Sequence, residues 1–89
     1  MEYLKIRKIF FWRNNSGAYV TERNHFLRFG EPGSPDIFAI HNGSIYGLEV
    51  KTPKGKPSLL QSLWSESFTT AGGHYYLVRS IDDVIKIFP

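Results

Sequence analysis

Two mostly hydrophobic stretches in the middle of the chain, residues 36–41 and 44–51, are separated by the polar pair Asn42-Gly43. Both stretches are rich in the β-branched and aromatic residues that favour strands. Asn-Gly is the preferred pair for a two-residue type I′ turn, which needs positive φ at both positions. The pattern therefore predicts a β-hairpin with its tip at Asn42-Gly43.

Hydrophobic residues recur at helical spacing in two other segments. Near the N-terminus, Tyr3, Ile6 and Phe10 follow this spacing with basic residues between them. We therefore expect an amphipathic helix over residues 2–12. The polar and glycine residues at 14–17 should end it.

The second helix should begin after Ser58, because Ser58 and Gln61 form the capping-box pattern. An apolar stripe follows, which we expect to pack on the body of the protein and which Gly72-Gly73 should end. The members of this stripe are Leu60, Leu63, Trp64, Phe68 and Ala71.

The remaining segments complete the predicted order of elements. Residues 18–21 are β-prone, residues 23–34 indicate a long connection, and residues 74–79 should form a strand. A short helix capped by Ser80 should end near Phe88. We therefore expect one domain over residues 1–89 of the α/β class, with a mixed β-sheet flanked by helices in the order α-β-β-β-α-β-α.

Composition sets limits on this picture. With 89 residues, of which 42% are hydrophobic and 16% aromatic, the chain can form one modest core. It has no cysteine and no apolar run near the roughly 20 residues that span a bilayer, so we expect a cytoplasmic protein without membrane contact. The net charge of +3 is only a weak indication of an anionic partner, since many proteins that bind no nucleic acid share it.

The predicted hairpin brings two acidic residues together, because counting back from the turn sets Asp36 opposite Glu49. Like charges at opposed positions, with Cβ atoms about 4.5–5.5 Å apart, are unfavourable unless a cation lies between them. Hard oxygen ligands suit Mg²⁺ or Mn²⁺. Lys51 points to the same face as Glu49, where its ammonium group could contact an attacking water or a phosphate.

Each of these residues also has a purely structural interpretation. Asp36 could begin a strand after Pro35, and Glu49 and Lys51 could be ordinary exposed positions on a half-solvated sheet. Gly47 should either leave space beside the pair or make room for an aromatic ring across the hairpin. The structural interpretation is weakened by the apolar residues on the same face, which are Phe38, Ile40 and Ile45.

Several short motifs together resemble the VRR-NUC branch of the PD-(D/E)XK nuclease superfamily. A Pro-Asp followed by Glu-x-Lys is common, whereas the further motifs make the resemblance more specific, and it covers most of the chain. It implies a restriction-endonuclease-like core. The motifs are Gly33-Ser34-Pro35-Asp36, Leu48-Glu49-Val50-Lys51, Gly-Lys-Pro-Ser-x-x-Gln at residues 55–61, a tryptophan in the next helix and a Gly-Gly before an aromatic strand.

The resemblance also implies roles for individual residues. Asp36, Glu49 and the backbone carbonyl of Val50 would bind the divalent metal. Lys51 would position or stabilise the nucleophile, and Gln61 would orient groups around the site.

Other site residues keep two interpretations. A glutamate on an N-terminal helix belongs to many such nucleases, and Glu2 is the matching residue, although a charge there also favours the helix dipole. Gln61 is explained equally well by the capping box. Lysines beyond the Glu-x-Lys strand could contact phosphate or keep a loop soluble. The residues expected to contact DNA are Lys54, Lys56, Arg13 and Ser58.

Together these features predict a Mg²⁺- or Mn²⁺-dependent DNA endonuclease. Stand-alone members of the family resemble junction-cutting enzymes that act as homodimers, so branched DNA such as a Holliday junction is the expected substrate. The alternatives are a flap or single-strand nuclease of the same fold and a non-catalytic DNA-binding module. The residues expected at the dimer interface are Phe10, Phe11 and Trp12 on the first helix, and residues 26–29.

Overall fold

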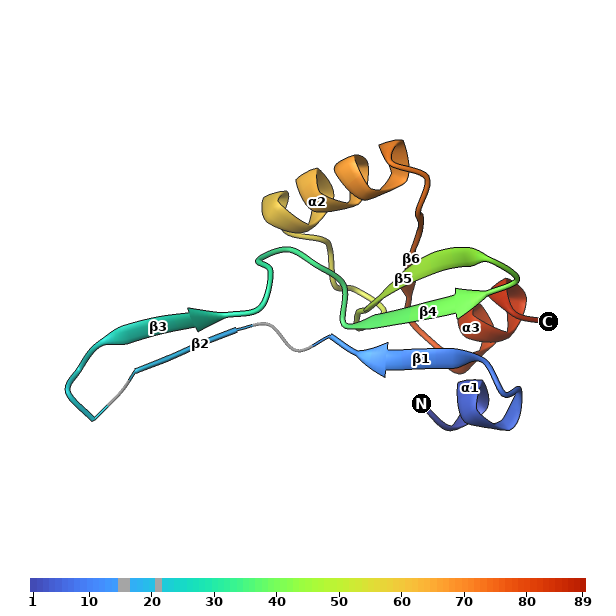
Figure 1. Ribbon diagram of the computed structural model, residues 1–89, viewed down its shortest axis with the longest axis horizontal. Helices are drawn as coiled ribbons and strands as arrows, with labels where there is room; N and C mark the ends of the chain where they lie inside the picture. The colour runs from blue at the N-terminus through green and yellow to red at the C-terminus, as the bar shows by residue number, and fades with distance from the viewer. Residues whose placement is uncertain (15–16, 21) are drawn as a thin grey trace.

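The computed structural model describes residues 1–14, 17–20 and 22–89, and at 17–20 and 26–29 it describes the backbone. Figure 1 shows the arrangement of the elements. In chain order they are α1 (Glu2–Ile6), β1 (Phe10–Arg13), β2 (Gly17–Val20), β3 (Phe26–Phe29), β4 (Ile37–His41), β5 (Ser44–Val50), α2 (Leu59–Thr70), β6 (His74–Val78) and α3 (Ile81–Ile87).

The body of the protein is a four-stranded mixed sheet in the order β1-β4-β5-β6. Strand β4 runs antiparallel to both of its neighbours, β1 and β5, whereas β6 runs parallel to β5 after the crossover through α2. Helix α2 lies on one side of this sheet, and α1 and α3 lie on the other (Figure 1). The expected α/β class with a mixed sheet flanked by helices is confirmed.

The central hairpin forms as predicted. Asn42 and Gly43 have φ values of 52° and 80°, which are the positive angles that a type I′ turn requires. The β4–β5 register pairs Ile40 with Ile45 and continues to Ile37 opposite Leu48. One further step along this register sets residue 36 opposite residue 49.

The prediction of a helix over residues 2–12 is wrong beyond its first half. Helix α1 ends at Ile6, Lys8 adopts a positive φ of 57°, and Phe10 begins a strand. The reason lies in tertiary structure: β1 pairs with β4, and Trp12 lies against Phe38 with ring centroids 5.4 Å apart. Aromatic residues favour such cross-strand contacts over a helix, and the pairing is invisible to local spacing.

The prediction of a long connection over residues 23–34 is also wrong, because β3 lies inside it. Strand β3 pairs with β2 in an antiparallel two-stranded sheet, with Gly17 opposite Phe29. This hairpin projects from the body of the protein (Figure 1). The observed order is therefore α-β-β-β-β-β-α-β-α, and the two strands that the sequence pattern missed are β1 and β3.

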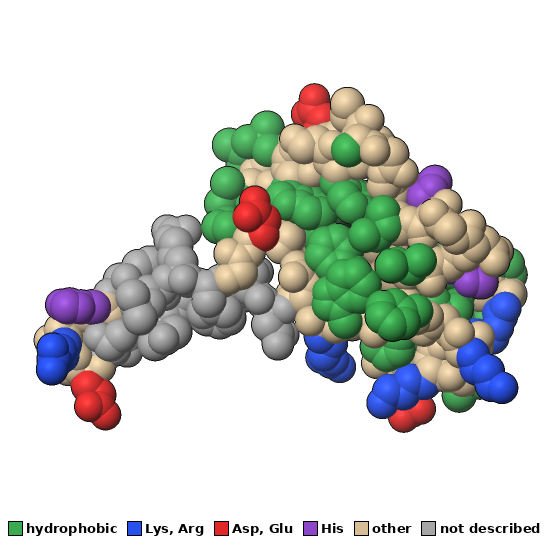
Figure 2. Space-filling model, in the orientation of Figure 1, with side chains coloured by type: hydrophobic (Ala, Val, Ile, Leu, Met, Phe, Trp, Pro, Cys, Tyr) green, Lys and Arg blue, Asp and Glu red, His purple; other side chains and the backbone are tan. Residues whose placement is uncertain are grey.

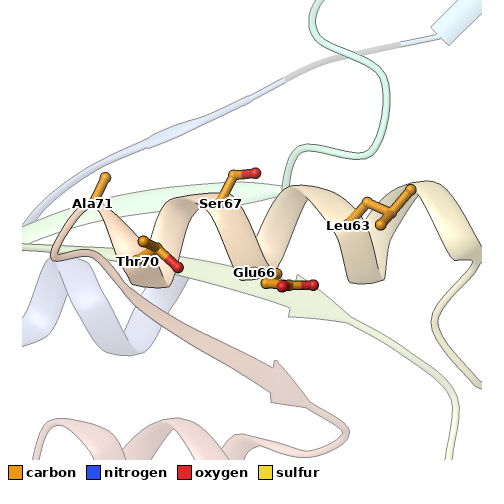
Figure 3. A pocket seen from close by; sticks show the side chains of 5 residues that line it. All are labelled: Leu63, Glu66, Ser67, Thr70 and Ala71. Atoms are coloured by element: carbon orange, nitrogen blue, oxygen red, sulfur yellow. The ribbon is translucent and has the colours of Figure 1, made fainter.

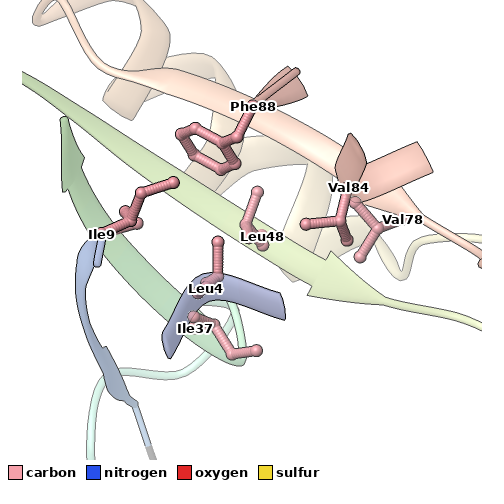
Figure 4. Packing of buried hydrophobic residues seen from close by; sticks show 8 residues of the cluster. Leu4, Ile9, Ile37, Leu48, Val78, Val84 and Phe88 are labelled. Carbon is pink, nitrogen blue, oxygen red and sulfur yellow. The ribbon is translucent and has the colours of Figure 1, made fainter. Parts of the chain in front are cut away.

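The buried core lies on the face of the sheet that α1 and α3 cover (Figure 4). Leu4 of α1 and Val84 of α3 are buried against the sheet, and Tyr3 donates a hydrogen bond of 2.6 Å to the carbonyl of Phe88. This contact ties the two ends of the chain together. The buried hydrophobic residues are Leu4, Ile9, Ile37, Ala39, Leu48, Val78, Val84 and Phe88.

Helix α2 begins and ends as predicted, but its apolar stripe is not packed as expected. Its capping box is formed, yet none of its residues is buried, and Leu60 and Leu63 are 54% and 52% exposed. Trp64 and Phe68 do contact the sheet, each 5.9 Å from the ring of Phe38. The stripe is therefore divided between residues that contact the sheet and residues that face away from it.

Candidate functional site

Asp36 lies immediately before β4, next to the end of β5. Its Oδ2 accepts a hydrogen bond of 2.9 Å from the backbone N–H of Val50. This bond extends the β4–β5 pairing beyond Ile37, so the Asp36 carboxylate is held beside Glu49. The juxtaposition of these two carboxylates therefore arises from the hairpin register that the Asn-Gly turn sets.

Glu49 is buried, with only 3% of its surface exposed. Its Oε2 atom is buried and has no hydrogen-bond partner among the residues that the structure describes. The pKa of Glu49 is raised to about 7, first by burial and then by the charge and hydrogen bonding of the neighbouring Asp36, while the charge of Lys51 acts to lower it. Two neighbouring carboxylates, one of them buried, repel each other unless a proton or a cation lies between them.

The donor set at this position fits a hard divalent cation. Two carboxylates, completed by waters and a substrate phosphate, are the usual protein ligands of Mg²⁺. Outside residues 15–16 and 21, no cluster of three acidic, histidine or cysteine side chains with metal-binding geometry is present. An ion at this position would have Asp36 and Glu49 as its carboxylate ligands, and both metal binding and the role of the Val50 carbonyl stay predictions.

Lys51 directly follows β5 and is half-buried. Its backbone N–H donates a bond of 3.0 Å to the carbonyl of Val78, so the chain remains attached to β6 at this point. The charge of Lys51 lowers the pKa of Glu49, so its ammonium group is close enough to interact electrostatically with the acidic pair. This is the arrangement expected from the spacing of Glu49 and Lys51.

Asn14 organises the segment that carries Asp36, and the sequence pattern did not identify it. Its side chain donates bonds of 2.7 Å to Ser34 Oγ and 2.9 Å to the carbonyl of Pro35. Its backbone N–H donates a further bond of 2.7 Å to the carbonyl of Asp36. We had expected Asn14 only to end the first helix, and no local signal distinguishes these two roles.

Two glycines fit this segment against the rest of the protein. Gly33 has a φ of 84°, and a Cβ atom there would lie 2.6 Å from the carbonyl oxygen of Leu60, so the segment rests on the first turn of α2. At Gly47, a Cβ would lie 2.9 Å from Pro35 Cγ and 3.4 Å from the ring of Phe68. The space at Gly47 is thus filled by these two side chains and is not open beside the pair.

Gln61 lies on the first turn of α2, close to the segment at Gly33. Its Oε1 accepts a bond of 2.9 Å from the N–H of Ser58, while its own N–H donates to Ser58 Oγ at 3.2 Å. The structural interpretation of both residues is therefore confirmed. Their roles in orienting the site and contacting DNA stay predictions.

Glu2 is separated from the acidic pair by the sheet. It is exposed on α1, whose buried residue Leu4 belongs to the core on the opposite face from α2. The acidic pair shares its face with Phe38, which contacts α2. No described interaction joins Glu2 to the pair, and its proposed part in metal binding stays a prediction.

The basic loop after Lys51 is held by an arginine that the sequence analysis did not single out. Arg79 Nη1 donates hydrogen bonds to the carbonyls of Thr52, Pro53 and Gly55, at 2.7, 3.3 and 2.6 Å. Because Nη1 carries only two N–H groups, two of these carbonyls share one of them. The residues predicted to contact DNA are all exposed, and that contact stays a prediction: Lys54, Lys56, Arg13 and Ser58.

A shallow hollow of about 480 Å³ lies along α2, away from the acidic pair (Figure 3). It offers one carboxylate, that of Glu66, and the hydroxyl groups of Ser67 and Thr70. The side chains that line this hollow include no positively charged group and no pair of carboxylates. This hollow therefore offers a divalent cation fewer carboxylate ligands than the acidic pair does.

None of the helices in the described part of the chain has the length and apolar character needed to cross a bilayer. Comparison of this chain with protein-family models, with curated proteins and with solved structures finds no match.

Proposed function

We propose that this protein is a metal-dependent nuclease of the PD-(D/E)XK type, in the VRR-NUC branch, which hydrolyses phosphodiester bonds in DNA. The single observation that supports it most is the placement of two carboxylates side by side, with Asp36 held at the end of β5 by the Val50 N–H and Glu49 buried beside it. The sequence motifs around both residues agree with that chemistry. A cytoplasmic setting and a restriction-endonuclease-like core belong to the same proposal.

The residues have distinct tasks in this mechanism. A bound Mg²⁺ or Mn²⁺ supplies an activated water and neutralises charge on the phosphate. Asp36 and Glu49 would hold the ion, and the hydrogen bond from the Val50 N–H fixes the orientation of Asp36. Lys51 adds positive charge on the same face, where the phosphorane-like transition state gains negative charge.

The proposed substrate is branched DNA, cut by a homodimer with paired sites. Support comes from the exposed aromatic residues of β1, which lies at the edge of the sheet, and from the basic loop beyond β5. Two sites related by a two-fold axis would cut two strands symmetrically.

Cleavage assays with metal titration test the proposal on linear, flapped and four-way DNA. Asp36→Asn and Glu49→Gln should each abolish cleavage, because either change removes a metal ligand while keeping the side-chain shape. Glu66→Gln, at an exposed glutamate of α2, is the matched control and should cleave like the wild type.

The outcomes separate the possible functions. Undiminished cleavage in excess chelator, or by either carboxylate variant, contradicts the metal-dependent site. If the protein prefers flapped or single-stranded DNA, it is still a metal-dependent nuclease, but its substrate is not a junction. Binding without any cleavage identifies a non-catalytic DNA-binding module.

A further inference from the structure

Tyr75 is the second residue whose buried polar atom has no partner. Within the described parts of the chain, the buried side-chain oxygens and nitrogens that lack a hydrogen bond are Tyr75 Oη and Glu49 Oε2. Buried hydroxyl groups nearly always have a partner, in the protein or in an ordered water. Two unsatisfied atoms in one small domain therefore call for a common explanation.

The sheet register places these two residues on the same face. Tyr75 pairs with Gly47 across the parallel β5–β6 ladder, and Glu49 follows two residues later on β5. Residues two apart on a strand share a face, so Tyr75 is a diagonal neighbour of Glu49. Diagonal neighbours lie about 7–8 Å apart, within the reach of an aromatic side chain.

The surroundings of Tyr75 support this placement. Its ring lies 6.4 Å from that of Trp64, under α2, so the hydroxyl group is covered on the helix side. Burial, together with the charges of Glu49 and Asp36, raises the pKa of Tyr75 to about 12. The hydroxyl therefore keeps its proton at neutral pH and lies in the field of both carboxylates as a hydrogen-bond donor.

We propose that Tyr75 is a positioning residue of the site, whose hydroxyl donates through one enclosed water to Glu49 Oε2 and fixes the orientation of that carboxylate. The water would satisfy both unpaired atoms at once. The other oxygen of Glu49 is then free to face Asp36 and the cation. This role rests on the proposed metal-dependent function.

Tyr75→Phe tests the inference because it keeps the ring under Trp64 and removes only the hydroxyl. Partners that orient a metal ligand typically account for 10- to 100-fold in metal affinity or activity. We expect about ten-fold weaker Mn²⁺ binding by calorimetry on the full chain without DNA. Cleavage should show a similar fall in kcat with an unchanged KM for DNA, and the Tm in chelator should stay near the wild-type value.

Tyr76→Phe is the matched control, since Tyr76 is the next residue on β6, faces the other side of the sheet and is exposed. Wild-type Mn²⁺ affinity and kcat in Tyr75→Phe would overturn the inference, as would equal losses in both variants or a loss that follows a lower Tm. If the wild type itself neither binds Mn²⁺ nor cleaves, the proposed function fails instead.

Discussion

At the residue scale, Glu49 is held in an environment that opposes its own charge. Burial removes water from the carboxylate, and Asp36 adds a like charge beside it. Opposed like charges cost up to about 1 kcal/mol on a strand pair, and burial of a charged group adds to this. A bound divalent cation would relieve both penalties. On the proposed function, the metal-bound protein should therefore be more stable than the metal-free protein.

The raised pKa of Glu49 gives a testable pH dependence of stability. In the metal-free fold this pKa is about 7, against an ordinary value of 4.5, so the folded state binds the proton more tightly than the unfolded state. The stabilising effect of the proton is complete below pH 4.5 and is lost as the pH rises through 7. One pKa unit corresponds to about 1.4 kcal/mol, so stability should fall by up to about 3 kcal/mol across this interval.

Urea unfolding in chelator between pH 4.5 and 8 measures this loss. Glu49→Gln removes the titrating group, so its stability should be nearly constant where the wild type declines, and it should exceed the wild type at pH 8. Parallel pH profiles for the two proteins would show that Glu49 does not titrate in this range.

At the scale of elements, the lysines after β5 lie in two different environments. Lys51 is half-buried and still attached to β6, whereas Lys54 and Lys56 are exposed in the loop that Arg79 holds. The first lysine lies in the field of the acidic pair. The loop lysines are free to follow a phosphate backbone.

Lysine-to-alanine substitutions should distinguish these roles. Lys51→Ala should lower kcat much more than DNA affinity, because its charge acts where the transition state gains charge. Lys54→Ala and Lys56→Ala should mainly weaken binding, and each should reduce the slope of log K against log salt by about 0.9 per lost phosphate contact. Cleavage rates and binding at several salt concentrations measure both effects. Equal losses of binding alone in all three variants would indicate a plain basic patch.

At the scale of the whole molecule, one face of the sheet is only partly covered. Figure 2 shows an apolar area between α2 and β1. Phe10, Trp12 and Ile40 are 66%, 40% and 43% exposed, and the Phe10 and Trp12 rings lie 5.9 Å apart. Strand β1 is also at the edge of the sheet, which leaves one side of its backbone free to pair. A second copy of the chain could cover both features. The other predicted interface segment, residues 26–29, has side chains outside the described residues.

A homodimer is the expected outcome of light scattering at micromolar concentration, with twice the chain mass of 10.3 kDa. Phe10→Glu should yield a monomer, because a charge would be buried in the apolar interface. Ile6→Glu is the matched control, since Ile6 is similarly exposed but belongs to α1, on the opposite side of the sheet, and its variant should remain dimeric. A wild-type monomer that still cleaves would favour the flap or single-strand substrate over the junction.

Several features of this protein were determined by the sequence itself. Some features depend only on neighbours within a few residues, and they formed as predicted. They are the turn at Asn42-Gly43, the capping box at Ser58 and the N-cap at Ser80. The position of Asp36 opposite Glu49 follows from the turn, by counting residue pairs back along the two strands. These features are local in origin, so short-range chemistry was sufficient to predict them.

Other features were decided only by tertiary structure. Residues 10–13 have helical spacing but form a strand, because pairing with β4 and contact with Phe38 outweigh a weak local preference. The same long-range packing placed Asn14 against the Asp36 segment and Arg79 against the basic loop. It also buried Glu49 and the hydroxyl oxygen of Tyr75. The strands that provide their surroundings are distant in sequence, and no local pattern records which of them become neighbours.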